Sequence, residues 1–269
     1  AMFTGPLAYA YPSFRLPAVG DALSTAFLPL NLYEIAYRRW GESAFAWALK
    51  RGYTFGAAPI NRDQQENARH FLRASLYAFL FGRDLPGRCA PPVLGSRESA
   101  SLGMGCLKNG DEAMMTVNYG PRETRGHLDT LGFTFYANDD ILVPDYGTPS
   151  HGESEGDWHC RTCSHNTILV DGKPHDPAAR CNVKLRCFGS SFQSIECEAS
   201  DCYPGVTHTR RLAMVGSICI ISDTIAGEEE HQYDWTMRCE GDPVLIGEYD
   251  PAEVDIGDTH SVAAAAQAY

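Results

Sequence analysis

The hydrophobic pattern of the sequence changes once, at the Pro- and Gly-rich stretch "GRDLPGRCAPPVLG" (82–95). Before it, segments such as "PLNLYEIAYRRWG" place apolar residues three or four positions apart and end on Gly41 or Gly82, which is typical of amphipathic helices. After it, short strand-like runs such as "TLGFTFYAN", which alternates apolar and polar residues, and "NTILVDG" are separated by turn residues, which is typical of antiparallel strands. The sequence therefore predicts an α+β chain, with helices in residues 1–85 and an antiparallel β-sandwich in residues 86–269.

The helical part is too small to bury its own apolar faces. Two or three helices are predicted, one of them in "NRDQQENARHFLRASLYAFLFG" with Phe71, Leu76 and Phe79 on one stripe. Such helices must pack either on the rest of this chain or on further helices before residue 1. The start "AMFTGPLAYAYPSF" has no signal-peptide pattern, and the end "SVAAAAQAY" does not close the last strand. We therefore expect a truncated part of a longer protein, incomplete at the C-terminus of its sandwich.

The charge balance limits the classes of partner. The formal net charge is −12, with 34 acidic and 22 basic residues, so the field of the protein does not attract nucleic acid. A polyanionic substrate would be repelled at long range and would need a local basic site. No run of about 18 apolar residues occurs, so we expect no membrane span. The pattern leaves a homo-oligomer open.

Ten cysteines are scattered through the chain, several of them in strand patterns such as "SICIISD". Free cysteine behaves as a small hydrophobic residue, so we expect most of them to be buried thiols, which suits a reducing compartment. Because the number is even, disulfides are an alternative, and the cysteines therefore do not decide between the cytoplasm and the periplasm of a bacterium. Cys160 and Cys163 also have the spacing of a metal or redox pair, for which His159, Cys181 or Cys187 would have to supply further ligands.

Three polar residues stand at the ends of neighbouring strand patterns. His127 precedes "TLGFTFYAN", Asp145 follows "DILVP", and His165 opens "HNTILVDG". Two imidazoles and one carboxylate are a common ligand set for zinc, with water or another group in the fourth position. Each residue also has a plainer explanation, because a histidine at a strand start is commonly hydrogen-bonded and "PDYG" is an ordinary turn. The spacing alone leaves both explanations open.

A longer set of motifs follows one order along the chain. "LPAVGDA" precedes "LYEIAYRRWGESAFAWAL", and then come "VNYGPRETRGHLDTLGFTFYANDDILVPDYG", "CSHNTILVDGK" and "YPGVTHTRRLAMVGSICIISDTIAGEEEHQYDW". From about residue 12 onward, the chain thereby resembles the C-terminal half of the heparinase II/III-like polysaccharide lyases, a superfamily that includes oligoalginate lyases. The resemblance implies the end of an α/α toroid in residues 1–85, followed by the sandwich. It also implies that His127, Asp145 and His165 bind a metal, usually zinc, in a mainly structural role.

The resemblance implies a lyase that cleaves a uronic-acid glycoside by β-elimination. Such a reaction needs one group that neutralises the carboxylate and another that acts as the base. Where the family has the first histidine of its His-Gly-His motif, this chain has Arg125. Arginine is always charged and pairs with carboxylates, so Arg125 suits the first role but not the second. A structural ion pair with Glu123 or Asp129 is the alternative.

The resemblance also places the family's catalytic Tyr, with its partner Asn and His, in toroid helices. No matching set occurs in residues 1–85, where Tyr33 and Tyr37 fit a packing face. We therefore expect the base to lie before residue 1, and this chain to carry one wall of the site. The loop "TPSHGESEGDWHCRTCS" is expected to border the cleft, with His151 and Trp158 in contact with sugar.

In "VTHTRRL", we expect His208, Arg210 and Arg211 to be strand residues that face solvent or one another. Two functions then remain. The first is a polysaccharide lyase that acts on an acidic polysaccharide or oligosaccharide, either a glycosaminoglycan such as heparin or heparan sulfate, or alginate. The second is a non-catalytic carbohydrate-binding or structural β-sandwich module whose zinc only holds strands together, which the presence of Arg125 slightly favours.

Overall fold

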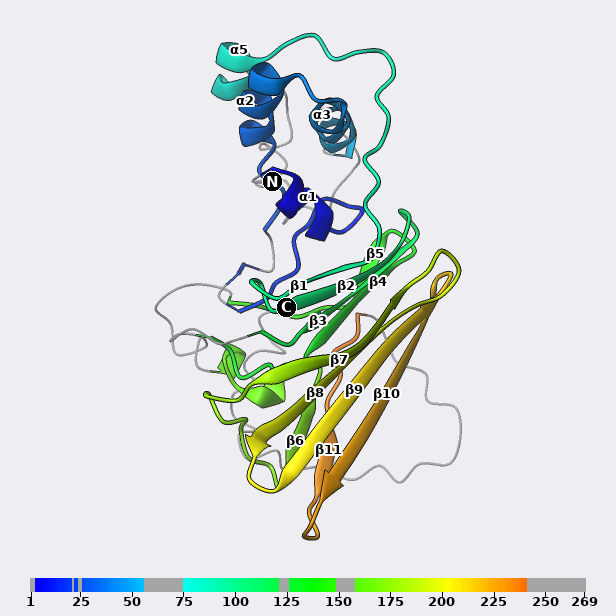
Figure 1. The fold of residues 1–269 in the computed structure, drawn as a ribbon. Coiled ribbons are helices and arrows are strands. Elements are labelled where there is room, and N and C mark those ends of the chain that lie inside the picture. Colours follow the sequence, from blue (N-terminus) through cyan, green and yellow to red (C-terminus); the bar gives the residue numbers. More distant parts are fainter. Residues whose placement is uncertain are drawn as a thin grey trace. The chain divides into compact units, whose positions relative to one another are not determined.

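The computed structural model describes residues 3–20, 22–23, 26–55, 75–120, 126–148 and 158–240 (Figure 1). The chain forms two compact units. The first contains Ala1–Leu16 and Phe27–Leu94, and the second contains Pro17–Ala26 and Gly95–Tyr269. The boundary after Leu94 lies within the Pro- and Gly-rich stretch.

The first unit is helical. Its helices are α1 (Thr4–Tyr9), α2 (Leu30–Trp40), α3 (Ser43–Phe55) and α5 (Leu76–Phe81). Helix α2 ends at Gly41, whose φ of 67° allows its N–H to bond to the carbonyl of Tyr37. Buried side chains such as Tyr33, Phe45 and Leu49 form the core of this unit. The tyrosine hydroxyl of Tyr33 donates to the carbonyl of Phe3 at 2.6 Å, in agreement with a packing role.

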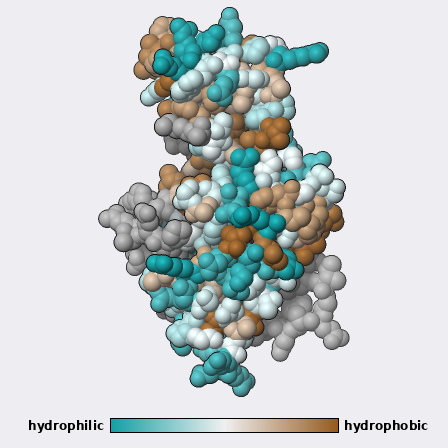
Figure 2. Space-filling model, in the orientation of Figure 1, coloured by the Kyte–Doolittle hydropathy of each residue, from teal (hydrophilic) through white to brown (hydrophobic). Residues whose placement is uncertain are grey.

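The predicted helix before Gly82 is described only in its last turns. Most of its stripe, including Phe71, lies outside the described residues. In α5, the side chains of Leu76, Phe79 and Leu80 are 66%, 85% and 55% exposed. The brown surface at the upper left of Figure 2 lies where Figure 1 places α5. This helix therefore presents an apolar face to solvent within its own unit.

The second unit consists of antiparallel sheets, which confirms the prediction for the C-terminal part of the chain. A five-stranded sheet runs in sequence order through β1 (Arg97–Ser99), β2 (Met104–Asn109), β3 (Ala113–Asn118), β4 (Phe133–Ala137) and β5 (Asp140–Val143). A four-stranded sheet has the order β10-β9-β8-β7, with β7 at Cys181–Phe188, β8 at Gln193–Tyr203, β9 at Val206–Val215 and β10 at Ile218–Gly227. β6 (Ile168–Val170) pairs with β11 (Tyr233–Trp235).

The two larger sheets pack face to face (Figure 1). Their common core contains apolar side chains of both sheets, among them Met115, Phe133, Ile195 and Leu212. In the five-stranded sheet the residues on the other face are buried as well, as the runs of buried positions in β2, β3 and β4 show. The hydroxyl groups of Thr116 and Thr134 on that face lie 2.6 Å apart and satisfy each other.

The turn between β4 and β5 contains residue types that favour tight turns. Asn138 and Asp139 have positive φ angles of 54° and 63° between β4 and β5, the geometry of a tight hairpin turn. A closer approach occurs at Gly103, where an added Cβ would lie 1.7 Å from the Cα of Gly120. Because Gly103 also has a φ of 60°, both its backbone angle and its surroundings require glycine.

All ten cysteines are free thiols, and several are buried. Burial raises the pKa of the Cys106 thiol to about 11 and that of Cys197 to about 12. Such thiols are protonated and unreactive near neutral pH. Among the described residues, no helix is long and apolar enough to cross a membrane.

Glu98 in β1 connects the edges of the two sheets, and its loss tests that connection. Its carboxylate accepts a hydrogen bond from the hydroxyl of Tyr119 and one from Nη1 of Arg186 in β7, each at 2.6 Å. We expect Glu98→Ala to lower the free energy of unfolding by about 1 kcal/mol, because the arginine is largely exposed. Urea unfolding measures this. The control Glu112→Ala removes a carboxylate that bonds to Asn109 within one turn, and an equal effect of both variants would contradict the connection.

Candidate metal centre

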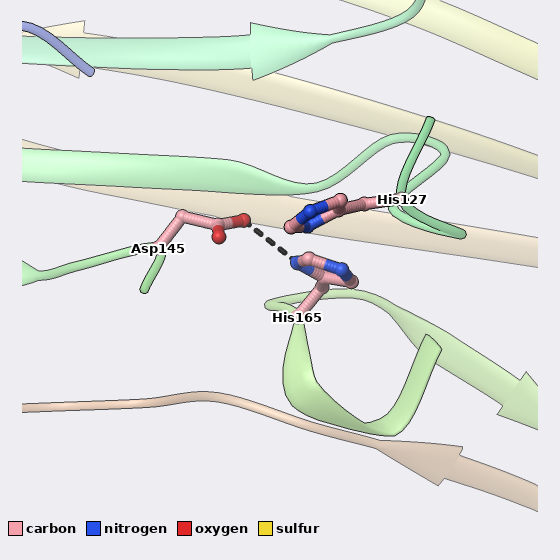
Figure 3. Close-up of side chains that lie close together, drawn as sticks. All are labelled: His127, Asp145 and His165. Atoms are coloured by element: carbon pink, nitrogen blue, oxygen red, sulfur yellow. Dashed lines mark hydrogen bonds and ion pairs between the residues drawn. The ribbon is translucent and has the colours of Figure 1, made fainter. Parts of the chain in front are cut away.

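His127, Asp145 and His165 come together from three segments of the second unit (Figure 3). His127 lies between β3 and β4, Asp145 follows β5, and His165 follows the short 3-10 helix η2 (Thr162–Ser164). Each residue offers a donor atom within 4.8 Å of the donor atoms of the other two. Nδ1 of His165 lies 2.8 Å from Oδ2 of Asp145. The sequence-based expectation that these residues meet at the strand ends therefore agrees with the structure.

The centre is buried. The two histidines are each 1% exposed, and the two rings lie 5.2 Å apart between centroids. Burial by itself would raise the pKa of Asp145, but the neighbouring His165, a hydrogen bond from the N–H of Gly147 and the ring of His127 outweigh it. The pKa of Asp145 is therefore below the ordinary value, and the group is a carboxylate at neutral pH.

The segment that carries Asp145 contacts both the segment Pro17–Ala26 and His127. The N–H of Thr148 donates to the carbonyl of Ala22 at 3.1 Å, and Leu23 forms a β-bridge with Gly147. Oγ1 of Thr148 in turn lies 3.0 Å from Nε2 of His127. The segment Pro17–Ala26 thus helps to fix Thr148, which lies next to one of the three donors.

Asn166 joins the three segments, and the sequence reasoning did not single it out. Its Nδ2 donates to the carbonyl of Phe133 at 2.9 Å and to that of Pro144 at 2.7 Å. Its Oδ1 accepts from the N–H of Arg238 at 2.6 Å. Thr167 adds a bond from its hydroxyl to the carbonyl of Thr130 at 2.7 Å. The "HNT" motif was the available signal: His165 is the donor, and the two residues after it hold the segments of the other donors.

Asp129 has a structural role next to the centre. Its Oδ2 accepts from Nδ2 of Asn118 at 2.5 Å, and its carbonyl accepts from the N–H of Gly132 at 2.7 Å. This turn leads into β4 through Leu131, which has a φ of 58°. A buried carboxylate so placed is a turn-stabilising group rather than a fourth donor of the cluster, which is formed by the other three residues.

The donor set fits a divalent zinc ion. Zinc holds nitrogen and oxygen ligands at about 2.0–2.2 Å, so two donors on one tetrahedral ion stand about 3.3–3.6 Å apart. The three donor atoms lie within 4.8 Å of one another, so small side-chain rotations bring them to that spacing. Among the described residues this is the only group of three or more His, Cys, Asp or Glu side chains that close together. Cys160 and Cys163 belong to no such group.

The expected substrate-contacting residues have different outcomes. Arg125 and His151 lie outside the described residues, as does Glu123. Trp158 is only 5% exposed, it packs with Cys163 and Leu169, and the guanidinium of Arg238 lies 5.6 Å from its ring centroid. In this arrangement the ring has little free surface for a sugar.

All three residues of "VTHTRRL" lie in strand β9, as predicted, but two of them do not face solvent. Arg211 is exposed and pairs with Glu196. His208 and Arg210, however, are 6% and 1% exposed, and both bond to Asp223 of β10. The alternation of β9 turns them toward the sandwich core and Arg211 away from it.

The buried His208 predicts a pH effect. Burial lowers its pKa, the nearby Arg210 lowers it further, and the bond to Asp223 only partly opposes this. The ring is thus neutral in the folded protein, whereas the unfolded chain takes up a proton below about pH 6.5, so stability falls as the pH falls below that value. We expect His208→Gln to lose less stability than the wild type between about pH 7 and pH 5, as measured by urea unfolding. Ser222→Ala should keep the wild-type slope, and an unchanged slope for His208→Gln would contradict the prediction.

Comparisons with known proteins agree with the fold. The family model "Heparinase II/III-like, C-terminal" matches residues 95–262. An alginate lyase of Stenotrophomonas maltophilia (strain K279a) is 26% identical over 146 residues, which are 45% of this chain and 20% of that protein. The solved structure of the heparinase III-BT4657 gene product superimposes with a TM-score of 0.63 at 18% identity, over 89% of this chain and 34% of that one. The heparan sulfate lyase HepC from Pedobacter heparinus gives 0.61 at 15% identity, over 88% and 34%.

The chain thus spans about a third of the length of the solved relatives and a fifth of the alginate lyase. The family model covers more than half of the chain and includes all three residues of the buried cluster. The chain belongs to the heparinase II/III-like family and contains its C-terminal domain.

Proposed function

We propose that this chain is the C-terminal part of a polysaccharide lyase that cleaves uronic-acid-containing polysaccharide by β-elimination, and that His127, Asp145 and His165 hold one zinc ion. The observation that carries the proposal is the convergence of these three buried donors, within 4.8 Å, in a domain of the heparinase II/III-like family. Names of the similar proteins, an alginate lyase and a heparan sulfate lyase, support an acidic polysaccharide as substrate.

The zinc ion would have a mainly structural role. The three donors lie on three different segments, so one ion would tie these segments together, and its binding free energy would add to the stability of the fold. Bound there, the ion would supply positive charge and fixed ligand geometry to the ends of these strands. The chain's own contribution is the network around Asn166 and Thr148, which fixes the donors.

We assign Arg125 to the carboxylate of the uronate. The proton at C5 is removed as a carbanion forms next to this carboxylate, so a cation that pairs with the carboxylate lowers the energy of the transition state. Arg125 stands two residues before His127, where the family has the first histidine of its His-Gly-His motif. The base that takes the C5 proton, and the group that protonates the leaving oxygen, would come from residues upstream of this chain.

The helical unit fits the end of an α/α toroid, the arrangement that we propose for residues 1–85, with residues 86–269 as the sandwich domain. The apolar side chains of α5 that face solvent within their unit, Leu76, Phe79 and Leu80, are what a helix of a larger helical array would show when its neighbours are absent. The sugar-contacting roles of His151 and Trp158 stay predictions, as does a homo-oligomeric state. For Trp158 to contact a sugar, the guanidinium of Arg238 would first have to move away from the face of its ring.

The second candidate is a non-catalytic carbohydrate-binding or structural module with a structural zinc. One observation favours it: the family's cleft histidine is replaced by Arg125. Both candidates share the zinc centre, so they differ in catalysis alone.

The whole protein, including residues upstream of this chain, decides between the two. It is incubated separately with heparan sulfate, heparin and alginate, and the ultraviolet absorbance of the unsaturated product is followed. Unsaturated product from one of these polymers supports the lyase and identifies that polymer as the substrate. Binding of a polymer without any unsaturated product, under conditions in which a known lyase of the family is active, would refute it in favour of the module.

A further inference from the structure

Arg210 of β9 is a fully buried arginine whose guanidinium is fixed from one side by the four-stranded sheet. Its Nε and Nη2 donate to the two carboxylate oxygens of Asp223 in β10, at 2.7 and 3.0 Å. Asp223 also lies 2.7 Å from Nε2 of His208 and accepts from Nε1 of Trp235 at 2.9 Å. Although burial alone would raise it, the bonds from His208 and Arg210 hold the pKa of Asp223 far below the ordinary value. The pair is therefore ionic at neutral pH.

The other side of the same guanidinium reaches two main-chain carbonyls outside the sheet. Nη1 donates to the carbonyl of Leu131 at 2.7 Å and to that of Asn166 at 2.6 Å. The ring of Phe133 covers the guanidinium, 5.1 Å from its centroid. Leu131 follows His127 by four residues, and Asn166 is the residue next to His165. One nitrogen atom therefore bridges the segments that carry two of the three donors of the metal centre.

The backbone conformation at Leu131 requires stabilising bonds from other segments. Its φ of 58° lies in the left-handed region, which costs a residue with a side chain about 1–2 kcal/mol. The N–H of Leu131 is fixed by the carbonyl of Asn118 at 2.8 Å, and its carbonyl by Arg210. The local sequence does not favour this conformation, so these two bonds help to hold the chain after His127 in place.

We propose that Arg210 is a positioning residue for the metal centre: its planar fork, anchored on Asp223, sets the spacing between the His127 and His165 segments. The inference rests on the zinc site proposed above. A lysine at the same place would keep the charge and the pairing with Asp223, but it lacks the fork that bonds to a carboxylate on one side and two carbonyls on the other. The substitution Arg210→Lys therefore removes the bridge while keeping the ion pair.

The first measurement needs no metal. Hydrogen exchange, read by mass spectrometry in chelator-treated whole protein, is compared for the wild type, Arg210→Lys and the control Arg211→Lys. The control makes the same change one residue along β9, where the arginine pairs with Glu196 on the exposed face. We expect Arg210→Lys to exchange faster in peptides that cover residues 126–132 and 164–168, with β8 and β10 unchanged. Faster exchange throughout the domain, or no change in the two peptides, would overturn the proposal.

The second measurement is the zinc dissociation constant, obtained by competition with a chromophoric chelator well below the melting temperature. We expect Arg210→Lys to weaken zinc binding by about 10- to 100-fold, the usual effect of losing a group that orients a metal ligand, and Arg211→Lys to leave it unchanged. A purely structural arginine would lower the melting temperature without moving this constant, and that result would overturn the proposal.

The two measurements separate the failure of this inference from failure of the proposed zinc site. If the wild type binds no zinc, the zinc site fails, and the exchange experiment alone decides the positioning role. Asp223→Asn provides a second variant, because an amide cannot accept both bonds of the arginine fork. This variant should also increase hydrogen exchange in the same two peptides. If neither variant folds while Arg211→Lys does, Arg210 is a general stabiliser of the sandwich and the proposal is wrong.

Discussion

Replacing His127 with alanine is expected to weaken zinc binding by more than about 100-fold, beyond the effect of losing a group that merely orients a ligand. Only Asp145 and His165 would remain in the cluster. At a zinc concentration about 100 times the wild-type dissociation constant, the bound ion contributes about 2.7 kcal/mol to the stability of the protein, and the variant should lose nearly all of it. Unfolding by urea with zinc and with chelator measures this difference directly.

A buried histidine outside the cluster serves as the control for His127→Ala. His175 is 2% exposed, and its Nε2 lies 3.1 Å from the carbonyl of Ile168. We expect His175→Ala to lower stability equally with and without zinc, because it loses packing and a hydrogen bond but no ligand. The zinc site would be refuted if wild-type protein prepared without chelator held far less than one equivalent of metal. It would equally be refuted if zinc stabilised His127→Ala as much as the wild type.

Arg125→Ala in the whole protein is expected to lower kcat/KM by a factor that corresponds to about 2–4 kcal/mol, the scale of one lost electrostatic donor to the transition state. Stability should barely change if Arg125 faces the substrate. A methyl-esterified substrate sharpens the test, because the ester carries no charge for Arg125 to neutralise. The wild type and the variant should therefore differ much less on the ester than on the free uronate.

The rival explanation of Arg125, an ion pair with Asp129 or Glu123, makes the opposite forecast. Loss of one partner of a buried pair lowers stability by about 3–5 kcal/mol, and it does so without substrate. Asp129 is 3% exposed and bonds to Asn118, so an additional pairing with Arg125 would show as coupling. A double-mutant cycle of Arg125→Ala and Asp129→Asn measures that coupling. Strong coupling in stability, with normal kcat/KM for Arg125→Ala, would make Arg125 a structural residue.

Local sequence signals predicted the parts of the fold that depend on neighbouring residues. The alternation after residue 95 gave the antiparallel strands, and the turn residues Asn138, Asp139 and Gly216 stand at hairpin turns with positive φ. The three residues of the cluster were candidates because each stands near the end of a strand pattern, and the family resemblance implied their metal-binding role. The alternation was weak in β2 and β3 for a physical reason: these strands are buried on both faces, so neither face needs polar residues.

Contacts between distant segments could not be predicted in the same way. The cover of Trp158 by Arg238 joins residues far apart in the sequence, and no local pattern reports it. Arg210 is a different case, because its partner followed from the register. Val215 pairs with Ile218 around the turn at Gly216, and counting back along both strands pairs Arg210 with Asp223. An arginine and an aspartate opposite each other in a hairpin were therefore visible, but their burial was not.

The close approach of Gly103 and Gly120 affects how a survey of tolerated substitutions in this family should be interpreted. No residue with a Cβ fits at Gly103, because the left-handed backbone and the facing Cα of Gly120 both exclude it. Gly120 is restricted in turn, since its own Cβ would lie 2.5 Å from the Cα of Gly103. These two positions would therefore be as invariant among working sequences as a residue that touches substrate. Their invariance would report the crossing of two backbones, and a search for active-site residues by mutational intolerance should set them aside.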